Sequence, residues 1–168
     1  QRKAKLKLYV KKVLISDDTY IIPPYLRFIS GVIDCADIPL TVSREILQEN
    51  NVVLSIKKAI KNRIISTLNK LAKDDKDKFD IFWEAFGPVI KEGIYEDYEK
   101  KDDLLKLIRF KSSNTKDGYR SLEEYIGDMK PNQKSIYFIT SEDYQSALAN
   151  PLLEGYLCLL YTSPSPRD

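Results

Sequence analysis

The chain of 168 residues contains no histidine. Histidine is the general base of most serine and cysteine hydrolase triads and the commonest ligand of catalytic zinc. Those chemistries are therefore not expected, and hydrolysis would need carboxylates or residues from another domain. The acidic pairs Asp74-Asp75 and Asp102-Asp103 lie in lysine-rich stretches, where solvation gives carboxylates ordinary properties.

Cysteine and long apolar runs are also scarce. Cys35 and Cys158 are the two cysteines, and their spacing fits no metal site, which favours a reduced cytoplasmic protein. No apolar run approaches the roughly 20 residues that span a bilayer, and no signal peptide is visible. We therefore expect a cytoplasmic location, no membrane partner and no metal site.

Glycine-rich phosphate loops are missing as well. Neither Gly-x-x-x-x-Gly-Lys nor Gly-x-Gly-x-x-Gly occurs, so the chain is not expected to hold ATP by itself. Its 27 basic and 25 acidic residues leave a formal charge of +2, which gives no general reason to expect a nucleic-acid partner.

The N-terminal part reads as strand, short helix and strand. Apolar residues alternate with polar ones at Leu6, Leu8 and Val10 and continue into the run 13–15. This pattern predicts one strand that becomes fully buried. Pro23-Pro24 predicts the start of a helix that Gly31 ends, and a short strand, Val32-Ile33, follows.

Residues 51 to 73 carry the clearest helical period. The apolar positions recur every three or four residues, at Val53, Ile56, Ile60, Ile64, Leu68 and Leu71. The other side of this predicted helix is basic, with Lys57, Lys58, Lys61, Arg63, Lys70 and Lys73. That basic side is either a solvated face or a surface that docks acidic protein or RNA.

A second helical stripe continues the period with Phe79, Phe82, Phe86 and Ile90. Gly87-Pro88 predicts a kink, or a stop and restart, and Gly93 the end of the helix. Trp83 lies one position off the stripe and is either a core aromatic or an anchor for a partner.

The C-terminal third again alternates helix and strand. Leu104 to Ile108 predict a helix, and residues 109–111 predict a strand. Ser121 with Glu124 fits a capping box at the start of a short helix. Residues 135–139 predict a buried strand, and Thr140 or Ser141 would cap the helix that follows. The alternation indicates an α/β fold. Residues 157–168 change composition abruptly and are expected to be a disordered, non-native tail.

One segment carries a candidate functional pair. If Ser43 caps a helical turn, Arg44 and Gln48 lie four apart on one face. A cation in the first turn opposes the helix dipole, so Arg44 is poorly placed for local stability. An ion pair with Glu45 or a remote carboxylate would explain its presence equally well.

The same segment resembles the middle domain of the ninety-kilodalton heat shock chaperones, in particular the bacterial HtpG type. The shared motifs occur in order from residue 4 to 156: 25–34, 37–40, 42–48, 70–75, 82–83, 86–87, 90–93, 107–110, 121–125 and 136–140. The resemblance implies that Arg44 reaches the γ-phosphate of ATP, bound with Mg²⁺ in a separate N-terminal domain, and that Gln48 supports this contact. Guanidinium forks bind phosphate oxygens bidentately, which suits that role.

The resemblance also implies an architecture. Residues 1–49 would end a larger α/β/α unit of the ribosomal protein S5 domain 2-like type and carry the ATP-contacting loop. Residues 50–108 would form a helical connector, and 109–156 the start of a smaller α/β/α unit. As an excised piece of a longer protein, the chain should have exposed strand edges and marginal stability alone.

The function implied is a share in ATP-dependent folding of client proteins. The parent protein would hydrolyse ATP, bind unfolded clients, close against its own N-terminal ATPase domain and form a homodimer through a C-terminal domain. The fragment alone should not turn over ATP. The alternative is a protein- or RNA-binding module that uses the basic helix, residues 57 to 73, without ATP coupling.

Overall fold

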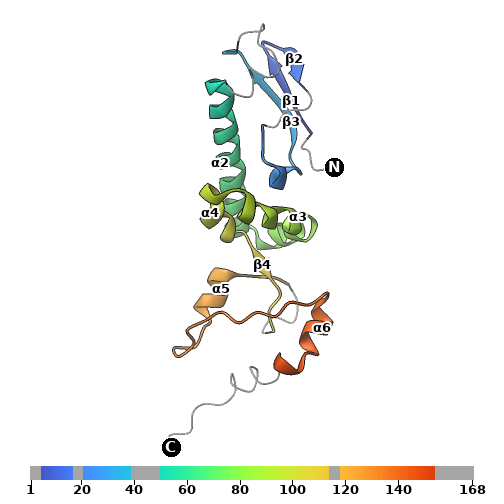
Figure 1. The fold of residues 1–168 in the computed structure, drawn as a ribbon, viewed down its shortest axis with the longest axis vertical. Helices are drawn as coiled ribbons and strands as arrows, with labels where there is room; N and C mark the ends of the chain where they lie inside the picture. The colour runs from blue at the N-terminus through green and yellow to red at the C-terminus, as the bar shows by residue number, and fades with distance from the viewer. Residues whose placement is uncertain (1–4, 17–20, 39–49, 114–117, 154–168) are drawn as a thin grey trace, which may run out of the picture. The chain divides into compact units, whose positions relative to one another are not determined.

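The computed structural model describes residues 5–16, 21–38, 50–113 and 118–153. Arg44, Gln48, Cys158 and the predicted tail 157–168 lie outside these ranges. The chain divides into two compact units, Gln1–Arg109 and Phe110–Asp168. Figure 1 shows their elements along the chain, and each unit is described by itself below.

The first unit begins with a three-stranded sheet in the order β2-β1-β3. Strand β1 (Lys5–Val10) pairs antiparallel with β2 (Val13–Ser16) and parallel with β3 (Ser30–Cys35). Leu6, Leu8 and Val10 are all buried, so the alternation seen in the sequence is confirmed for β1. In the described ranges, β2 and β3 form the two edges of this sheet.

The prediction of one continuous buried strand was wrong beyond Val10. Lys11 and Lys12 have φ values of 48° and 68°, the left-handed pair required by a tight two-residue hairpin turn. The turn reverses the chain onto the exposed edge of the sheet, and Val13 and Leu14 are therefore 50% and 48% exposed.

The segment between β2 and β3 contains a single turn of 3-10 helix, η1 (Pro24–Leu26), instead of a longer helix that ends at Gly31. Tyr25 and Leu26 on this turn are fully buried. Gly31 lies inside β3 with a φ of 155°, so the glycine belongs to the strand rather than to a helix end.

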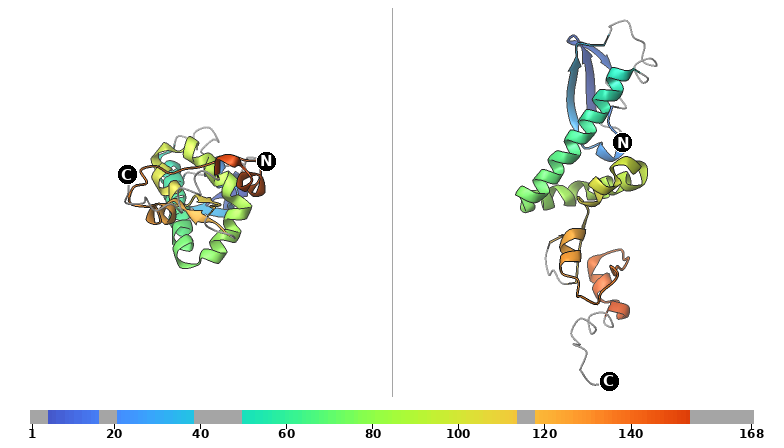
Figure 2. Two further views of the ribbon diagram at one scale, coloured as in Figure 1. Left: turned by 90° about the horizontal axis from the view of Figure 1, so that it is seen from below. Right: turned by 90° about the vertical axis from the view of Figure 1, so that its left-hand side faces the viewer.

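Two long helices follow. Helix α2 (Asn51–Asp74) confirms the predicted helix; the Asn50 side chain caps it by accepting a hydrogen bond from the Val52 N–H at 2.8 Å. Helix α2 runs beside the sheet in both Figure 1 and Figure 2.

Helix α3 (Lys76–Glu96) is capped by Asp75 and continues through Pro88, so no stop occurs there. Gly93 is buried inside α3, and the prediction that it ends the helix was wrong.

Two short elements, η2 (Tyr98–Lys100) and α4 (Lys101–Leu105), complete the first unit. Leu107 and Ile108, predicted to be helical, follow α4 but remain buried in the core. None of the described helices combines the length and apolarity required to cross a membrane.

The second unit is smaller. Strand β4 (Arg109–Phe110), which begins at the last residue of the first unit, pairs with β5 (Arg120–Ser121), and the helices are α5 (Leu122–Gly127) and α6 (Tyr144–Leu148). The capping box between Ser121 and Glu124 is confirmed. Helix α6 is capped by Asp143, whose carboxylate accepts from the Ser146 N–H at 2.8 Å, and not by Thr140 or Ser141.

The buried strand predicted at 135–139 is absent. Its residues form no ladder, and the Tyr137 and Phe138 side chains are 54% and 85% exposed. A strand needs a neighbour to accept its backbone hydrogen bonds, and the described residues of this unit offer only the two-residue pair β4 and β5. As a whole, the described chain is a mixed α/β structure.

Candidate functional site

The two residues predicted to contact ATP, Arg44 and Gln48, lie in residues 39–49, outside the described part of the chain. The structure does describe what precedes and follows them. Ile38, immediately before, is 1% exposed. Asn50, immediately after, caps α2. Ile38 and Asn50 are therefore the described residues that border this segment, and a buried polar cluster of Tyr25, Lys61 and Asp97 lies in the same compact unit.

Tyr25 on η1 is one member of this polar cluster. Its ring is fully buried against Gly93 of α3, where an added Cβ would lie 2.7 Å from the ring carbons Cγ and Cδ2. Its hydroxyl donates a hydrogen bond to Asp97 Oδ2 at 2.8 Å. Burial first, and then the Asp97 carboxylate, raise the pKa of Tyr25 well above its ordinary value, so the phenol stays protonated and able to donate.

Asp97 also receives a second donor. The Lys61 Nζ of α2 lies 2.8 Å from the same Oδ2 atom, and the two side chains are only 18% and 11% exposed. Burial alone would raise the pKa of Asp97, but the hydrogen bonds from Lys61 and Tyr25 outweigh it and hold that pKa below its ordinary value. The stabilisation is therefore complete above the unfolded pKa of about 3.9 and is lost as the pH falls through the lower folded value.

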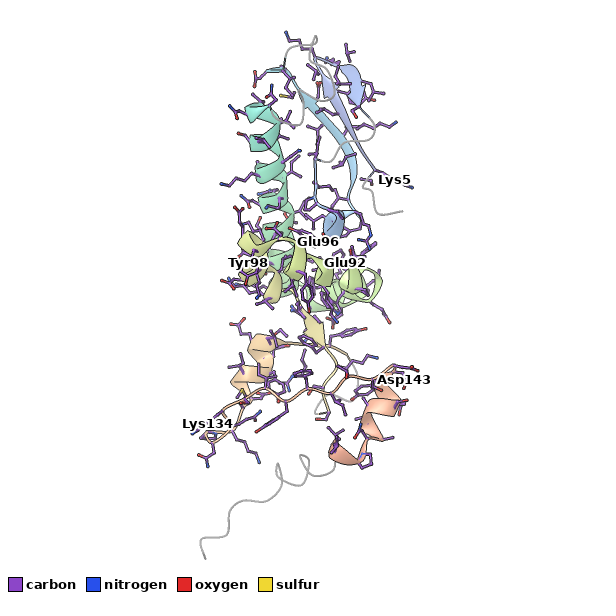
Figure 3. All side chains as sticks on the ribbon, in the orientation of Figure 1. Lys5, Glu92, Glu96, Tyr98, Lys134 and Asp143 are labelled. Carbon is purple, nitrogen blue, oxygen red and sulfur yellow. The ribbon has the colours of Figure 1, made fainter. Side chains whose placement is uncertain are left out.

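A bidentate ion pair lies beside this network. Arg27 donates from Nη1 and Nη2 to the two carboxylate oxygens of Glu92, at 2.6 and 2.9 Å. Figure 3 labels Glu92 on α3 and Tyr98 on η2, the two residues that bracket Gly93 and Asp97 along the chain. Both sides of Gly93 are thus tied to η1, by Glu92 through Arg27 and by Asp97 through Tyr25.

The close contact at Gly93 gives a testable stability prediction. Gly93→Ala should lower the free energy of unfolding of the first unit by about 1 to 3 kcal/mol, because the buried Tyr25 ring would have to move. The gain in helix propensity from alanine, about 1 kcal/mol, offsets part of this cost. Denaturant unfolding followed by the fluorescence of Trp83, the one tryptophan of the chain, measures the change.

Gly127→Ala is the matched control for that substitution. Gly127 ends α5, and an added Cβ there would meet nothing within 4 Å. We expect the free energy of unfolding of the second unit, followed by circular dichroism, to change by no more than about 0.5 kcal/mol. The unfolding transition followed by Trp83 fluorescence should not change. Equal destabilisation by the two alanines would contradict the packing argument at Gly93.

Aromatic side chains contribute to the core of the first unit. Phe79 is fully buried, stacks on Trp83 with the ring centroids 6.4 Å apart, and lies under the guanidinium of Arg109 at 4.6 Å. Trp83 is 4% exposed, so its interpretation as a core aromatic is confirmed and it does not serve as an exposed anchor. Phe28 contacts Phe82 and Phe86, which links the chain after η1 to α3.

An open groove of about 380 Å³ lies between α2 and the chain that enters η1. Three lysines of the basic side of α2, Lys57, Lys58 and Lys61, line it together with apolar residues. Its other lining residues are Ile21, Ile22, Pro23, Pro24, Leu54, Asp97 and Glu99. Lys61 is already paired with Asp97, so the basic face is partly used inside the unit.

Sequence reasoning missed Tyr25, Lys61 and Asp97 as a cluster. Tyr25 and Asp97 are separated by 72 positions, and Lys61 and Asp97 by 36, so no local pattern joins them. Lys61 was grouped with the basic side of its helix, interpreted as either a solvated face or a docking surface. Within the described ranges, no group of three or more acidic or cysteine side chains is arranged to hold a metal ion.

The described residues form a mixed α/β segment in which two long helices pack on each other and α3 packs on the η1 turn. Comparison with known proteins identifies its class. The model of the family described as Hsp90 protein matches residues 1–159. The chain therefore belongs to the Hsp90 family of heat shock chaperones, and the resemblance drawn from its motifs is confirmed.

Individual relatives point to the bacterial HtpG type. The chain is 47% identical over 156 residues to "Chaperone protein HtpG" of Rhizobium etli, covering 93% of this chain and 25% of that protein. It is 50% identical over 153 residues to the same-named protein of Francisella tularensis subsp. novicida, covering 90% and 24%. The chain thus spans about a quarter of the length of these curated relatives.

The solved structures include a close match in fold. The middle domain of a Plasmodium falciparum heat shock protein superposes with a TM-score of 0.81 at 32% identity, covering 95% of this chain and 61% of that one. The chain is accordingly part of a chaperone of the HtpG type and resembles the Hsp90 middle domain.

Proposed function

We propose that this segment supplies Arg44 to the ATPase cycle of a full-length HtpG-type chaperone that binds unfolded client proteins. The supporting observation is the family match over residues 1–159, which includes the Arg44 and Gln48 positions. The Hsp90 family binds ATP, and a guanidinium delivered from a neighbouring domain couples the state of the γ-phosphate to domain closure. Gln48 supports the same contact.

The chain has no glycine-rich phosphate loop, which is compatible with ATP being bound by a different domain of the whole protein. ATP and Mg²⁺ would be held by an N-terminal domain of the same protein, while this segment contributes one cation from outside that pocket. The whole protein would act as a cytoplasmic homodimer. Its middle region would contain a larger α/β/α unit ending near residue 49, a helical connector over 50–108, and a smaller unit that starts at 109–156.

A segment exchange tests this function. The region of Rhizobium etli HtpG that matches this chain is replaced by residues 4–156, giving a full-length protein that we call the carrier chaperone. We expect the carrier to hydrolyse ATP and to suppress aggregation of a denatured client, whereas the isolated segment should show no ATP turnover. ATP hydrolysis by the isolated segment would refute the proposed division between domains.

A further inference from the structure

The stretch of the second unit between α5 and α6 is unusually exposed. Residues 134–143, which we call the linking segment, are all exposed, and the side chains of Tyr137 and Phe138 are 54% and 85% exposed. Among the described residues of the second unit, Arg120 alone is buried, so none of their apolar side chains lies in a core. A unit without a core gains little stability by itself and needs a further surface to pack against.

Two hydrogen bonds show which side of the linking segment faces its own unit. The Tyr137 N–H donates to the Tyr125 hydroxyl of α5 at 3.4 Å, and the Gln133 side chain donates to the Ser135 carbonyl at 2.9 Å. Gln133 also donates to the Tyr125 hydroxyl, at 3.1 Å, so these contacts lie together. The chain crosses from α5 to α6 without a helical turn after residue 135 (Figure 1).

The other side of the same backbone is open. In an extended chain, the N–H and C=O groups of one residue point to one side and those of the next residue to the opposite side. Since Tyr137 bonds toward α5, the even-numbered residues Ile136, Phe138 and Thr140 direct their backbone groups away from it. No backbone hydrogen bond joins these three to another described residue. They form an edge of the kind that adds another strand.

The charges of the linking segment are arranged to match a second copy of itself. Lys134 begins it, Glu142 and Asp143 end it, and the seven residues between Lys134 and Glu142 are uncharged. Figure 3 labels Lys134 and Asp143 at the opposite ends. An antiparallel pair centred on Phe138 places Lys134 of each copy opposite Glu142 of the other, whereas a parallel pair would oppose like charges. The formal charge of +2 adds little general repulsion between copies.

We propose that the linking segment is a self-association site, at which two copies of this chain pair as antiparallel β-strands about a two-fold axis at Phe138. Ile136 would exchange backbone hydrogen bonds with Thr140 of the second copy, and Phe138 with the second copy's Phe138. The run 136–139, Ile-Tyr-Phe-Ile, has the β-branched and aromatic composition that favours strands. This inference depends on neither ATP nor Arg44.

Charge reversal in the 168-residue chain tests the pairing by analytical ultracentrifugation. We expect the parent to form a dimer with a Kd of about 100 μM or tighter. Lys134→Glu and Glu142→Lys should each raise the Kd about tenfold or more, because both charge pairs of the dimer become repulsive. The double variant with both substitutions reverses each pair, and its Kd should return to within about threefold of the parent.

Mixing the two single variants identifies the occupant of the edge. An equimolar mixture of Lys134→Glu and Glu142→Lys restores opposite charges at both positions, so it should form heterodimers although neither variant dimerises well alone. A surface elsewhere on the chain would not respond in this way. Failure of the mixture to associate more tightly than its components would overturn the antiparallel register and the proposal with it.

Two further substitutions compare exposed apolar side chains of the second unit. Phe138→Ser should raise the Kd about tenfold or more, because Phe138 lies on the two-fold axis. Leu152→Ser is the matched control: Leu152 is 72% exposed but lies outside the linking segment, and the Kd should stay within about twofold. Equal effects of these two changes would contradict the proposal. A parent chain that remains monomeric at about 1 mM would overturn it and leave the edge to another segment of the whole protein.

Discussion

Arg44→Ala in the carrier chaperone should lower kcat for ATP hydrolysis by about 1,000-fold, down to the assay background. Arginines delivered to a nucleotide from a neighbouring domain contribute roughly 10³ to 10⁵ to the rate in other nucleotide hydrolases. The dissociation constant for ATP should change little, because the adenine, ribose and most phosphate contacts would belong to the N-terminal domain. Steady-state turnover and nucleotide binding by calorimetry measure the two quantities separately.

Two further variants sharpen this experiment. Arg44→Lys keeps the charge but loses the planar fork, so its rate should fall between those of the parent and the alanine variant. Arg63→Ala is the matched control, since Arg63 is exposed on α2 and should leave turnover unchanged. Unaltered hydrolysis by Arg44→Ala would remove the catalytic role assigned to this arginine, whatever the family of the chain.

Phe79→Ala should have the largest effect on stability. Phe79 is fully buried, stacks on Trp83 and carries Arg109 over its ring, so its removal leaves a large cavity in the first unit. Losses of about 3 to 5 kcal/mol in the free energy of unfolding are typical of such truncations. The guanidinium of Arg109 would also lose its cation–π contact with the Phe79 ring. Urea unfolding followed by Trp83 fluorescence reports the change at the site of the cavity.

The neighbouring position Ile81 provides the control. Ile81 lies on the same helix but is 71% exposed, and Ile81→Ala should change stability by no more than about 0.5 kcal/mol. If Ile81→Ala destabilised the unit as much as Phe79→Ala, the burial pattern of α3 would be incorrect. If Phe79→Ala left the midpoint unchanged, Phe79 would not belong to the core.

Local patterns in the sequence predicted the features that depend on near neighbours. The period of α2, the alternation of Leu6, Leu8 and Val10, and the capping box at Ser121 were all correct, since each depends on residues within a few positions. The hairpin at Lys11 and Lys12 was missed because lysine gives no signal for a left-handed backbone.

Features that depend on distant partners were predicted less well. The run 135–139 has the composition of a buried strand, but composition cannot supply a neighbouring ladder. Gly93 suggested a helix end, whereas the glycine is required by the Tyr25 ring that packs against it from η1. The Arg44 motif was visible in the sequence, whereas the buried cluster formed by Tyr25, Lys61 and Asp97 was not.

The topology of the small sheet has a consequence for the order in which it forms. Strand β1 meets β2 through a two-residue reversal, and this hairpin can close as soon as residue 16 has left the ribosome. Its other partner, β3, ends only at Cys35 and must close a much longer loop. During synthesis, the edge of β1 that later pairs with β3 should therefore stay unpaired longer than the edge that pairs with β2, and in that interval it is open to pairing with another polypeptide.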